Sequence, residues 1–229
     1  MMKHLACIMD GNRRWAIENK VPLAYAYQQG IERICTVIDF ALAEEIEYVS
    51  LFGFSVQNMG RTFVEKQLLY SVILGLSDRI ISFIKERKVR VRCMGRRDYF
   101  PEEVRNFCDR LEMTTSQEVG LNVILLLGYG GQEDIVATTK LIAEQVALQK
   151  IVPEQVTDSF FKSHLLTSFL PDPELIIRTG KVKRLSNFFL YQAAYTELAF
   201  MDCLWPDITT EQLKVVFNDF SLVKRNFGL

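Results

Sequence analysis

The sequence has few of the residues that build metal clusters or disulfide frameworks. Two histidines among 229 residues make a multi-histidine metal centre nearly impossible, so a bound metal should be a hard, oxygen-ligated ion such as Mg2+. The five cysteines are odd in number and have no C-x-x-C spacing, which indicates free thiols in a reducing compartment. Because the amino-terminal segment also lacks the apolar core of a signal peptide, we expect a cytoplasmic protein.

An excess of one charge and long apolar runs are absent too. Twenty-seven basic residues against 28 acidic ones leave a formal net charge of -1, so the field that would attract a nucleic-acid backbone is missing. We therefore expect no nucleic-acid partner. No run of about 18 apolar residues is present to span a bilayer, which leaves at most peripheral membrane contact. With no linker and no internal repeat, residues 1–229 predict a single domain.

Two kinds of apolar pattern alternate along the chain. Short segments rich in apolar residues predict strands over 5–9, 47–54, 89–94, 121–127, 175–177 and 198–200, and the first of them is a continuous apolar run that is typical of a buried strand. Apolar residues spaced three and four apart predict helices over 21–42, 68–84, 101–115, 133–149 and 210–220. This alternation predicts an α/β fold with a central, mostly parallel sheet flanked by helices, and ligands should bind at the carboxyl ends of its strands.

Polar side chains gather after the predicted strands. Asp10-Gly11-Asn12-Arg13-Arg14 follows the first strand and offers a carboxylate, a glycine that permits close approach and two guanidinium groups. An arginine-rich helix start is suited to phosphate, and the carboxylate is suited to Mg2+. The later strands add Ser55, Asn58, Arg61, Arg178, Arg184, Ser186 and Glu197. Five arginines at one edge of the sheet fit the recognition of two diphosphate groups.

Each of these features has a plainer interpretation when it is taken alone. Asp-Gly is a common turn, an arginine pair often lies on a solvated face, and Glu197 could simply begin a strand. Gly128-Tyr-Gly-Gly131 is most simply a tight turn before a helix, and the phenylalanines could be core. The recurrence of charged groups at successive strand ends favours a binding site over these separate readings.

Seven segments resemble, in order and spacing, the motifs of the cis-prenyltransferase family, which is typified by undecaprenyl diphosphate synthase. The segments are Ile8-Met-Asp-Gly-Asn-Arg-Arg-Trp-Ala16, Gly128-Tyr-Gly-Gly131, Ile177-Arg-Thr-Gly180, Arg184-Leu-Ser-Asn-Phe188, Tyr195-Thr-Glu-Leu198, Leu204-Trp-Pro-Asp207 and Arg225-Asn-Phe-Gly228. The resemblance implies a homodimer with a six-stranded sheet that couples two isoprenyl diphosphates with the aid of Mg2+.

The resemblance also implies a role for each matching residue. Asp10 would bind Mg2+ and assist departure of the donor's diphosphate, and Glu197 would be a further Mg2+-associated carboxylate. The donor's diphosphate would be held by Gly11, Asn12, Arg13, Arg14 and Arg61. The diphosphate of the second substrate would be held by Arg178, Arg184 and Ser186. Asn58 would lie near the reacting carbons as a catalytic residue, in a substrate pocket formed by Trp15, Leu23, Tyr27, Phe54, Ser55 and Met59.

Departures from the undecaprenyl pattern are concentrated in the donor site. Leu23 replaces an arginine, Tyr27 a histidine and Met59 a tryptophan, so the grip on the donor's diphosphate is weakened. In these respects the chain resembles irregular prenyl synthases, which join short diphosphates head-to-middle into lavandulyl or cyclolavandulyl skeletons. Our leading expectation is therefore a short-chain synthase acting on dimethylallyl diphosphate. The alternatives are cis-elongation, in which isopentenyl diphosphate is added to geranyl or farnesyl diphosphate, and a non-catalytic partner subunit.

Overall fold

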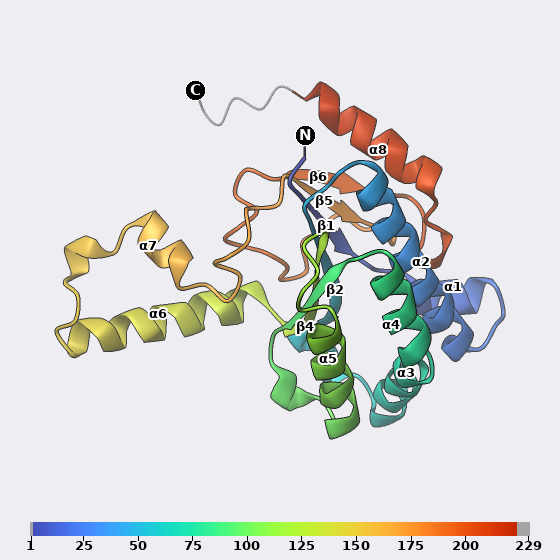
Figure 1. Ribbon diagram of the computed structural model, residues 1–229, viewed down its shortest axis with the longest axis horizontal. Coiled ribbons are helices and arrows are strands. Elements are labelled where there is room, and N and C mark those ends of the chain that lie inside the picture. Colours follow the sequence, from blue (N-terminus) through green and yellow to red (C-terminus); the bar gives the residue numbers. More distant parts are fainter. Residues whose placement is uncertain (1, 224–229) are drawn as a thin grey trace.

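A six-stranded sheet forms the centre of the molecule (Figure 1). The computed structural model describes residues 2–223, so the motif at 225–228 lies outside the described residues. The strands are β1 (His4–Ile8), β2 (Tyr48–Ser55), β3 (Arg90–Met94), β4 (Asn122–Tyr129), β5 (Leu175–Arg178) and β6 (Glu197–Phe200). Their spatial order is β3-β4-β2-β1-β5-β6, and every neighbouring pair is parallel. The predicted α/β fold with a parallel sheet is confirmed.

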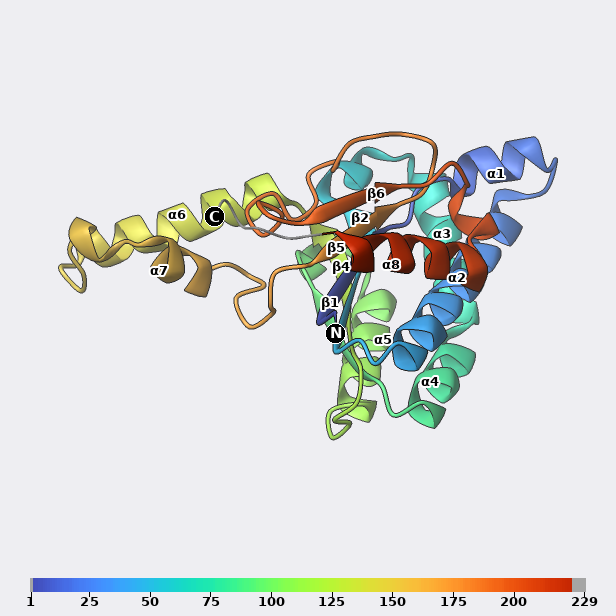
Figure 2. The same cartoon turned by 90° about the horizontal axis from the view of Figure 1, so that it is seen from above.

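Eight α-helices connect and cover the strands. They are α1 (Asn12–Glu18), α2 (Leu23–Ala43), α3 (Phe63–Gly75), α4 (Ser77–Glu86), α5 (Glu102–Thr114), α6 (Gly131–Ala147), α7 (Asp158–Ser163) and α8 (Thr210–Leu222) among the residues described. Helices α2, α3, α4, α5 and α8 cover one face of the sheet, whereas α6 and α7 extend away from the body (Figures 1 and 2). The five helices that cover the sheet leave one long, apolar layer between themselves and the strands.

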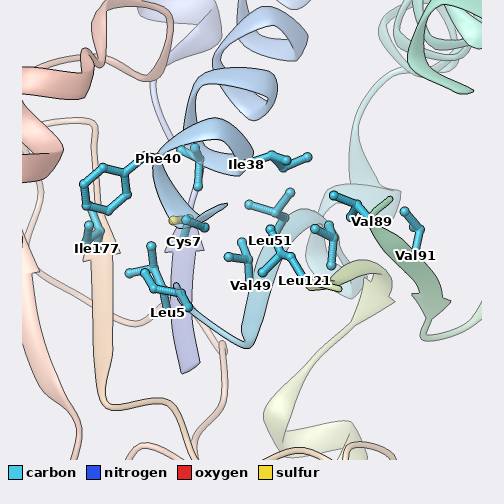
Figure 3. Packing of buried hydrophobic residues seen from close by; sticks show 14 of the residues in the cluster. Leu5, Cys7, Ile38, Phe40, Val49, Leu51, Val89, Val91, Leu121 and Ile177 are labelled. Carbon is cyan, nitrogen blue, oxygen red and sulfur yellow. The ribbon is translucent and has the colours of Figure 1, made fainter. Parts of the chain in front are cut away.

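That layer is the main hydrophobic core (Figure 3). Leu5 and Cys7 of β1 and Val49 and Leu51 of β2 are fully buried, and they pack with α2 residues such as Ile38. All five residues of β1 are buried because the strand lies inside the sheet with both faces covered. On the opposite face, irregular chain carries Phe188 and Phe189 onto the strands in a second buried cluster.

The helix predicted over 68–84 is wrong in its boundaries. It begins earlier, because Thr62 accepts a hydrogen bond from the Glu65 amide at 3.2 Å and caps α3. It is also interrupted after Gly75, where α3 and α4 meet at a bend of 50°. No single helix within residues 2–223 is long and apolar enough to cross a membrane. Among these residues, the bent α3–α4 pair taken together has the length and apolar composition of a membrane span.

Candidate active site

Asp10, Arg14, Arg178 and Ser186 form one hydrogen-bonded group at the carboxyl ends of β1 and β5, which we call the Asp10 cluster. Ile8 and Arg178 are register partners, so Asp10 and Arg178 meet although 168 residues separate them. Asp10 Oδ2 accepts from Arg178 Nη2 at 2.8 Å, and Asp10 Oδ1 accepts from Arg14 Nη2 at 3.0 Å. One carboxylate therefore orients two guanidinium groups from different parts of the chain.

Arg178 is the most buried charge of the Asp10 cluster, with a side chain only 3% exposed. Its Nη1 donates to Ser186 Oγ at 2.7 Å and to the Arg184 carbonyl oxygen, while Nε is buried without a partner in the described structure. Burial lowers the pKa of Arg178, but the Asp10 carboxylate opposes that shift and the guanidinium stays charged. A fixed, incompletely satisfied cation of this kind is suited to binding an anion.

The backbone around the Asp10 cluster is strained. Ser186 and Asn187 have φ values of +51° and +67°, a left-handed conformation that is uncommon for residues other than glycine. Gly180 has φ of +98°, and a Cβ there would lie 2.7 Å from Arg14 Nη2 and 2.9 Å from Asp10 Cγ. Strain of about 1 to 3 kcal/mol per residue is usually retained where it shapes a functional site.

A second group, the Arg61 cluster, consists of Arg13, Tyr27, Arg61 and Glu65. Glu65 accepts from Tyr27 Oη at 3.0 Å, and it forms ion pairs with Arg61 at 3.2 Å and with Arg13 at 3.5 Å. Burial is the main cause that raises the pKa of Tyr27 to about 12, so its hydroxyl remains a donor. The sequence reasoning missed Glu65, although its i,i+4 spacing from Arg61 was a signal.

The segment before Arg61 carries Asn58 in a tightly folded turn. Ser55 Oγ accepts from the Asn58 amide at 3.1 Å, and Asn58 Oδ1 accepts from the Ser55 amide at 3.1 Å. This reciprocal capping begins the short helix η1 (Val56–Gly60) directly after β2. The Asn58 side-chain oxygen is therefore held in place by the backbone of its own turn.

A cavity of about 390 Å³ opens between the Asp10 and Arg61 clusters and extends into the main core. Its polar mouth includes Asp10, Arg13, Arg61, Arg178 and Ser186. Its deeper wall is apolar and includes Ile34, Ile38, Phe107, Leu111, Val123 and Leu127. The residues describe a tunnel with a charged entrance and a hydrocarbon-like interior, which suits a ligand with an anionic head and a long apolar tail.

Comparison with known proteins agrees with this arrangement. Residues 8–228 match the family model described as "Putative undecaprenyl diphosphate synthase". The chain belongs to this prenyltransferase family. A ditrans,polycis-undecaprenyl-diphosphate synthase ((2E,6E)-farnesyl-diphosphate specific) of Xanthomonas axonopodis pv. citri is 36% identical, over 99% of this chain and 88% of that protein.

Two solved structures share the whole fold of this prenyltransferase. Lavandulyl diphosphate synthase from Lavandula x intermedia, in complex with dimethylallyl diphosphate, has a TM-score of 0.95, with 28% identity over 100% of this chain and 98% of that chain. An undecaprenyl diphosphate synthase described as probable, from Campylobacter jejuni, has a TM-score of 0.81, with 28% identity over 100% and 99% of the two chains.

The prenyltransferase places only part of the predicted substrate pocket on the tunnel wall. Tyr27, Phe54 and Ser55 line the cavity together with Asn12, Asn58 and Arg184. Trp15 instead donates to Asp207 Oδ1 at 2.6 Å and packs against Tyr25, and it does not line the cavity. Leu23 is half-buried at the start of α2, and Met59 packs against the cluster of Phe54, Tyr70, Phe100 and Val104.

Glu197 is the exception to the gathering of charge at one edge. It begins β6 and is the register partner of Leu175, whereas Arg178 and Asp10 lie at the carboxyl end. Because the strands are parallel, Glu197 and Asp10 lie at opposite ends of the sheet within one chain. Within one chain Glu197 therefore lies apart from Asp10, and its role as a further Mg2+-associated carboxylate stays a prediction.

The donor set of the prenyltransferase fits Mg2+ only in part. Among the described residues no group of three histidine, cysteine or acidic side chains could hold a metal. Mg2+ commonly binds proteins through one or two carboxylates and completes its shell with water and substrate phosphates. Asp10 provides such a carboxylate at the tunnel mouth, whereas the Asn12 side-chain oxygen is buried beside Gly30 of α2, where a Cβ would stand 2.4 Å from it. The Asp10 carboxylate suits a metal that arrives with a diphosphate.

Proposed function

We propose that this prenyltransferase is a cis-elongating prenyl diphosphate synthase, which adds isopentenyl diphosphate to an allylic diphosphate such as farnesyl diphosphate. The observation that carries the proposal is the depth of the apolar tunnel. The 36% identity to a synthase named as specific for farnesyl diphosphate supports the same assignment. We further propose Mg2+ as the cofactor and a homodimer as the working form, both from the family resemblance.

The tunnel depth follows from the residues that line it. On β4 the lining residues run from Leu127 to Val123, which is about 13 Å at about 3.3 Å per strand residue. On α2 they run from Tyr27 to Ile38, which is about 16 Å at about 1.5 Å per helical residue. The two walls give a consistent length.

Substrate tails can be compared with this length. A farnesyl tail has twelve carbons in line, and its eleven bonds of about 1.5 Å advance about 14 Å in an extended chain. A dimethylallyl tail has four carbons in line and spans less than about 5 Å by the same measure. The tunnel therefore matches a farnesyl tail and would leave most of its apolar wall uncovered by dimethylallyl diphosphate. Each methylene buried on that wall adds about 0.8 kcal/mol to binding.

The two polar clusters divide the chemistry between two diphosphates. Arg13 and Arg61 bind the donor's diphosphate with its tail in the tunnel, and the buried Arg178 holds the second diphosphate together with Arg184 and Ser186. Bound at Asp10, Mg2+ supplies charge neutralisation for the leaving group. The allylic C1–O bond breaks as C4 of the isopentenyl double bond attacks C1, and the diphosphate leaves. A C2 proton of the isopentenyl unit leaves with the released diphosphate and restores a double bond, while the apolar wall keeps water from the cation-like carbon.

Irregular coupling of two dimethylallyl diphosphates is the second candidate. It is favoured by Leu23 and Tyr27, and by the TM-score of 0.95 with a lavandulyl diphosphate synthase. Under this hypothesis the deep tunnel would have no substrate tail to hold. The two candidates differ in their requirement for isopentenyl diphosphate.

The dependence of rate on donor length tests the proposal. We would measure diphosphate release with isopentenyl diphosphate and Mg2+ while the donor changes from dimethylallyl to geranyl to farnesyl diphosphate. We expect kcat/KM to rise at least about tenfold over the series, because each added unit covers more of the wall. Equal or falling kcat/KM, with release from dimethylallyl diphosphate alone, would refute elongation in favour of irregular coupling.

A further inference from the structure

Glu133 joins the two halves of the candidate site without touching the tunnel. It lies in the first turn of α6, and its side chain is exposed beyond the residues that line the cavity. Glu133 Oε1 accepts from Gln57 Nε2 at 3.2 Å, and Glu133 Oε2 accepts from Asn187 Nδ2 at 2.7 Å. One carboxylate thus connects residues that are 130 positions apart.

The two partners of Glu133 flank residues with proposed roles in binding. Gln57 belongs to η1 and precedes Asn58, whose turn is followed by Arg61. Asn187 follows Ser186, which accepts from Arg178. The two hydrogen bonds to Glu133 therefore connect the turn on the donor side of the mouth with the loop that carries Ser186 of the Asp10 cluster.

Asn187 is the point on which this connection depends. Its Oδ1 accepts from the Gln132 amide at 2.8 Å, and its carbonyl oxygen accepts from the Gly131 amide at 2.7 Å. These bonds satisfy amides at the start of α6, which has no side-chain cap of its own. Asn187 and Ser186 both have positive φ, so the loop needs such outside contacts to keep its conformation.

Gly130 leaves room for the connection. A Cβ at this position would overlap Glu133 Oε2 and would stand 2.6 Å from Asn187 Nδ2. The residue itself has extended backbone with φ of -157°, which other residues can adopt. The absence of a side chain at Gly130 is therefore required by the Glu133–Asn187 contact rather than by the backbone conformation.

We propose that Glu133 is a positioning residue that fixes the donor-side turn 55–61 and the loop 184–189 relative to each other. The proposal rests on the proposed function, because both segments are there assigned to diphosphates. The carboxylate contacts no substrate, and its effect on the reaction passes through Asn58 and Ser186. Alignment of two bound reactants is a large term in bimolecular catalysis, so small displacements reduce turnover.

The test compares three variants of the full chain with a matched control. Glu133→Gln keeps the size but has one acceptor oxygen for two donors, Glu133→Ala has none, and Gly130→Ala displaces the carboxylate. Glu144→Ala removes an equal charge from an exposed position three turns along α6. We expect kcat to fall about threefold in Glu133→Gln and about tenfold in Glu133→Ala and Gly130→Ala, with Glu144→Ala unchanged.

Two further readouts separate positioning from a general loss of structure. We expect the dissociation constant for inorganic diphosphate to change less than about twofold, because the arginines remain, and the thermal midpoint to stay constant. Gln57→Ala should add no further loss to Glu133→Ala, because the bridge is already broken. Additive losses, an unchanged kcat in Glu133→Ala, or a parallel loss of diphosphate affinity would each overturn the proposal.

Hydrogen exchange keeps this outcome distinct from that of the proposed function. In Glu133→Ala, the amides of 184–189 should exchange at least about threefold faster, while those of β4 remain protected. If the wild-type chain couples no prenyl diphosphates but the loop still loosens, the proposed function fails and the structural role of Glu133 survives. If the loop exchanges at the wild-type rate, the positioning role is wrong whatever the activity.

Discussion

Leu125 lies halfway along the strand that forms one wall of the tunnel. It is half-buried in the middle of a covered sheet. It lines the cavity together with Leu127, which lies nearer the charged mouth, and Val123, which lies deeper. Each step between these residues is about 6.6 Å at about 3.3 Å per residue. A Leu125→Trp substitution should therefore close the lower half of the tunnel and leave its charged mouth intact.

The expected effect on product length follows from this geometry. One isoprene unit has four carbons in line and advances about 5 Å, so the loss of about 6.6 Å removes room for one to two units. With farnesyl diphosphate as the donor, whose tail of about 14 Å no longer fits, the yield of products in mass spectra should fall. With dimethylallyl diphosphate as the donor, chain growth by isopentenyl diphosphate should stop one to two units earlier than in the wild type. Overpacking should cost about 1 to 3 kcal/mol of stability, measured by urea unfolding. Leu125→Ala should shift products in the opposite direction.

A neighbouring residue provides the control. Leu126 belongs to the cluster on the other face of the sheet and does not line the cavity. Leu126→Ala should lower stability by about 2 to 5 kcal/mol without changing product length. If Leu125→Trp leaves the product distribution unaltered, or if Leu126→Ala changes it equally, the length of the tunnel does not limit the length of the prenyl chain and our reasoning is refuted.

Three further substitutions test the polar groups. Asp10→Asn keeps the size of the side chain but removes the charge that pairs with Arg178. Steady-state measurements of diphosphate release should show kcat reduced about 10²- to 10³-fold. Retained activity would exclude the role assigned to Asp10. Tyr27→Phe removes the hydroxyl that donates to Glu65. Because the pKa of Tyr27 is raised to about 12, the wild type and the variant should have pH–rate profiles of the same shape up to pH 10. A fall in the wild-type rate below pH 10 that the variant does not show would contradict this. Burial lowers the pKa of His4 from 6.5 to about 4, so its contribution to stability is complete above pH 6.5 and is lost as the pH falls toward 4. Urea unfolding should show about 3 kcal/mol lost over that range, and His4→Gln should abolish this component, so an unaltered pH dependence in the variant would assign it elsewhere.

The strands and the Asp10 cluster could be predicted from the sequence because their signals are local. A buried parallel strand reads as a continuous apolar run, and the residue that follows it must lie at the carboxyl edge. Asp10 and Arg178 each follow or end such a run, so their meeting required only that β1 and β5 be neighbours. Glu197 misled the prediction because it is the first residue of its strand and does not follow the strand's carboxyl end.

Other features depend on tertiary contacts that a single sequence does not encode. Glu65 became a member of the site only when α3 placed it against Tyr27 and Arg13. The interruption after Gly75 was hidden because apolar residues continue through it from α3 into α4. The tunnel itself is a gap between layers, and periodicity shows which residues are apolar without showing how far apart their layers stand.

Product analysis with defined substrates tests the central claim most directly. The chain would be incubated with Mg2+ and farnesyl plus isopentenyl diphosphates, and separately with dimethylallyl diphosphate alone, and the products would be identified by mass spectrometry. We predict a series of prenyl diphosphates that differ by five carbons in the first reaction and no product in the second. A branched ten-carbon product from dimethylallyl diphosphate alone, with no series from the first reaction, would contradict the account.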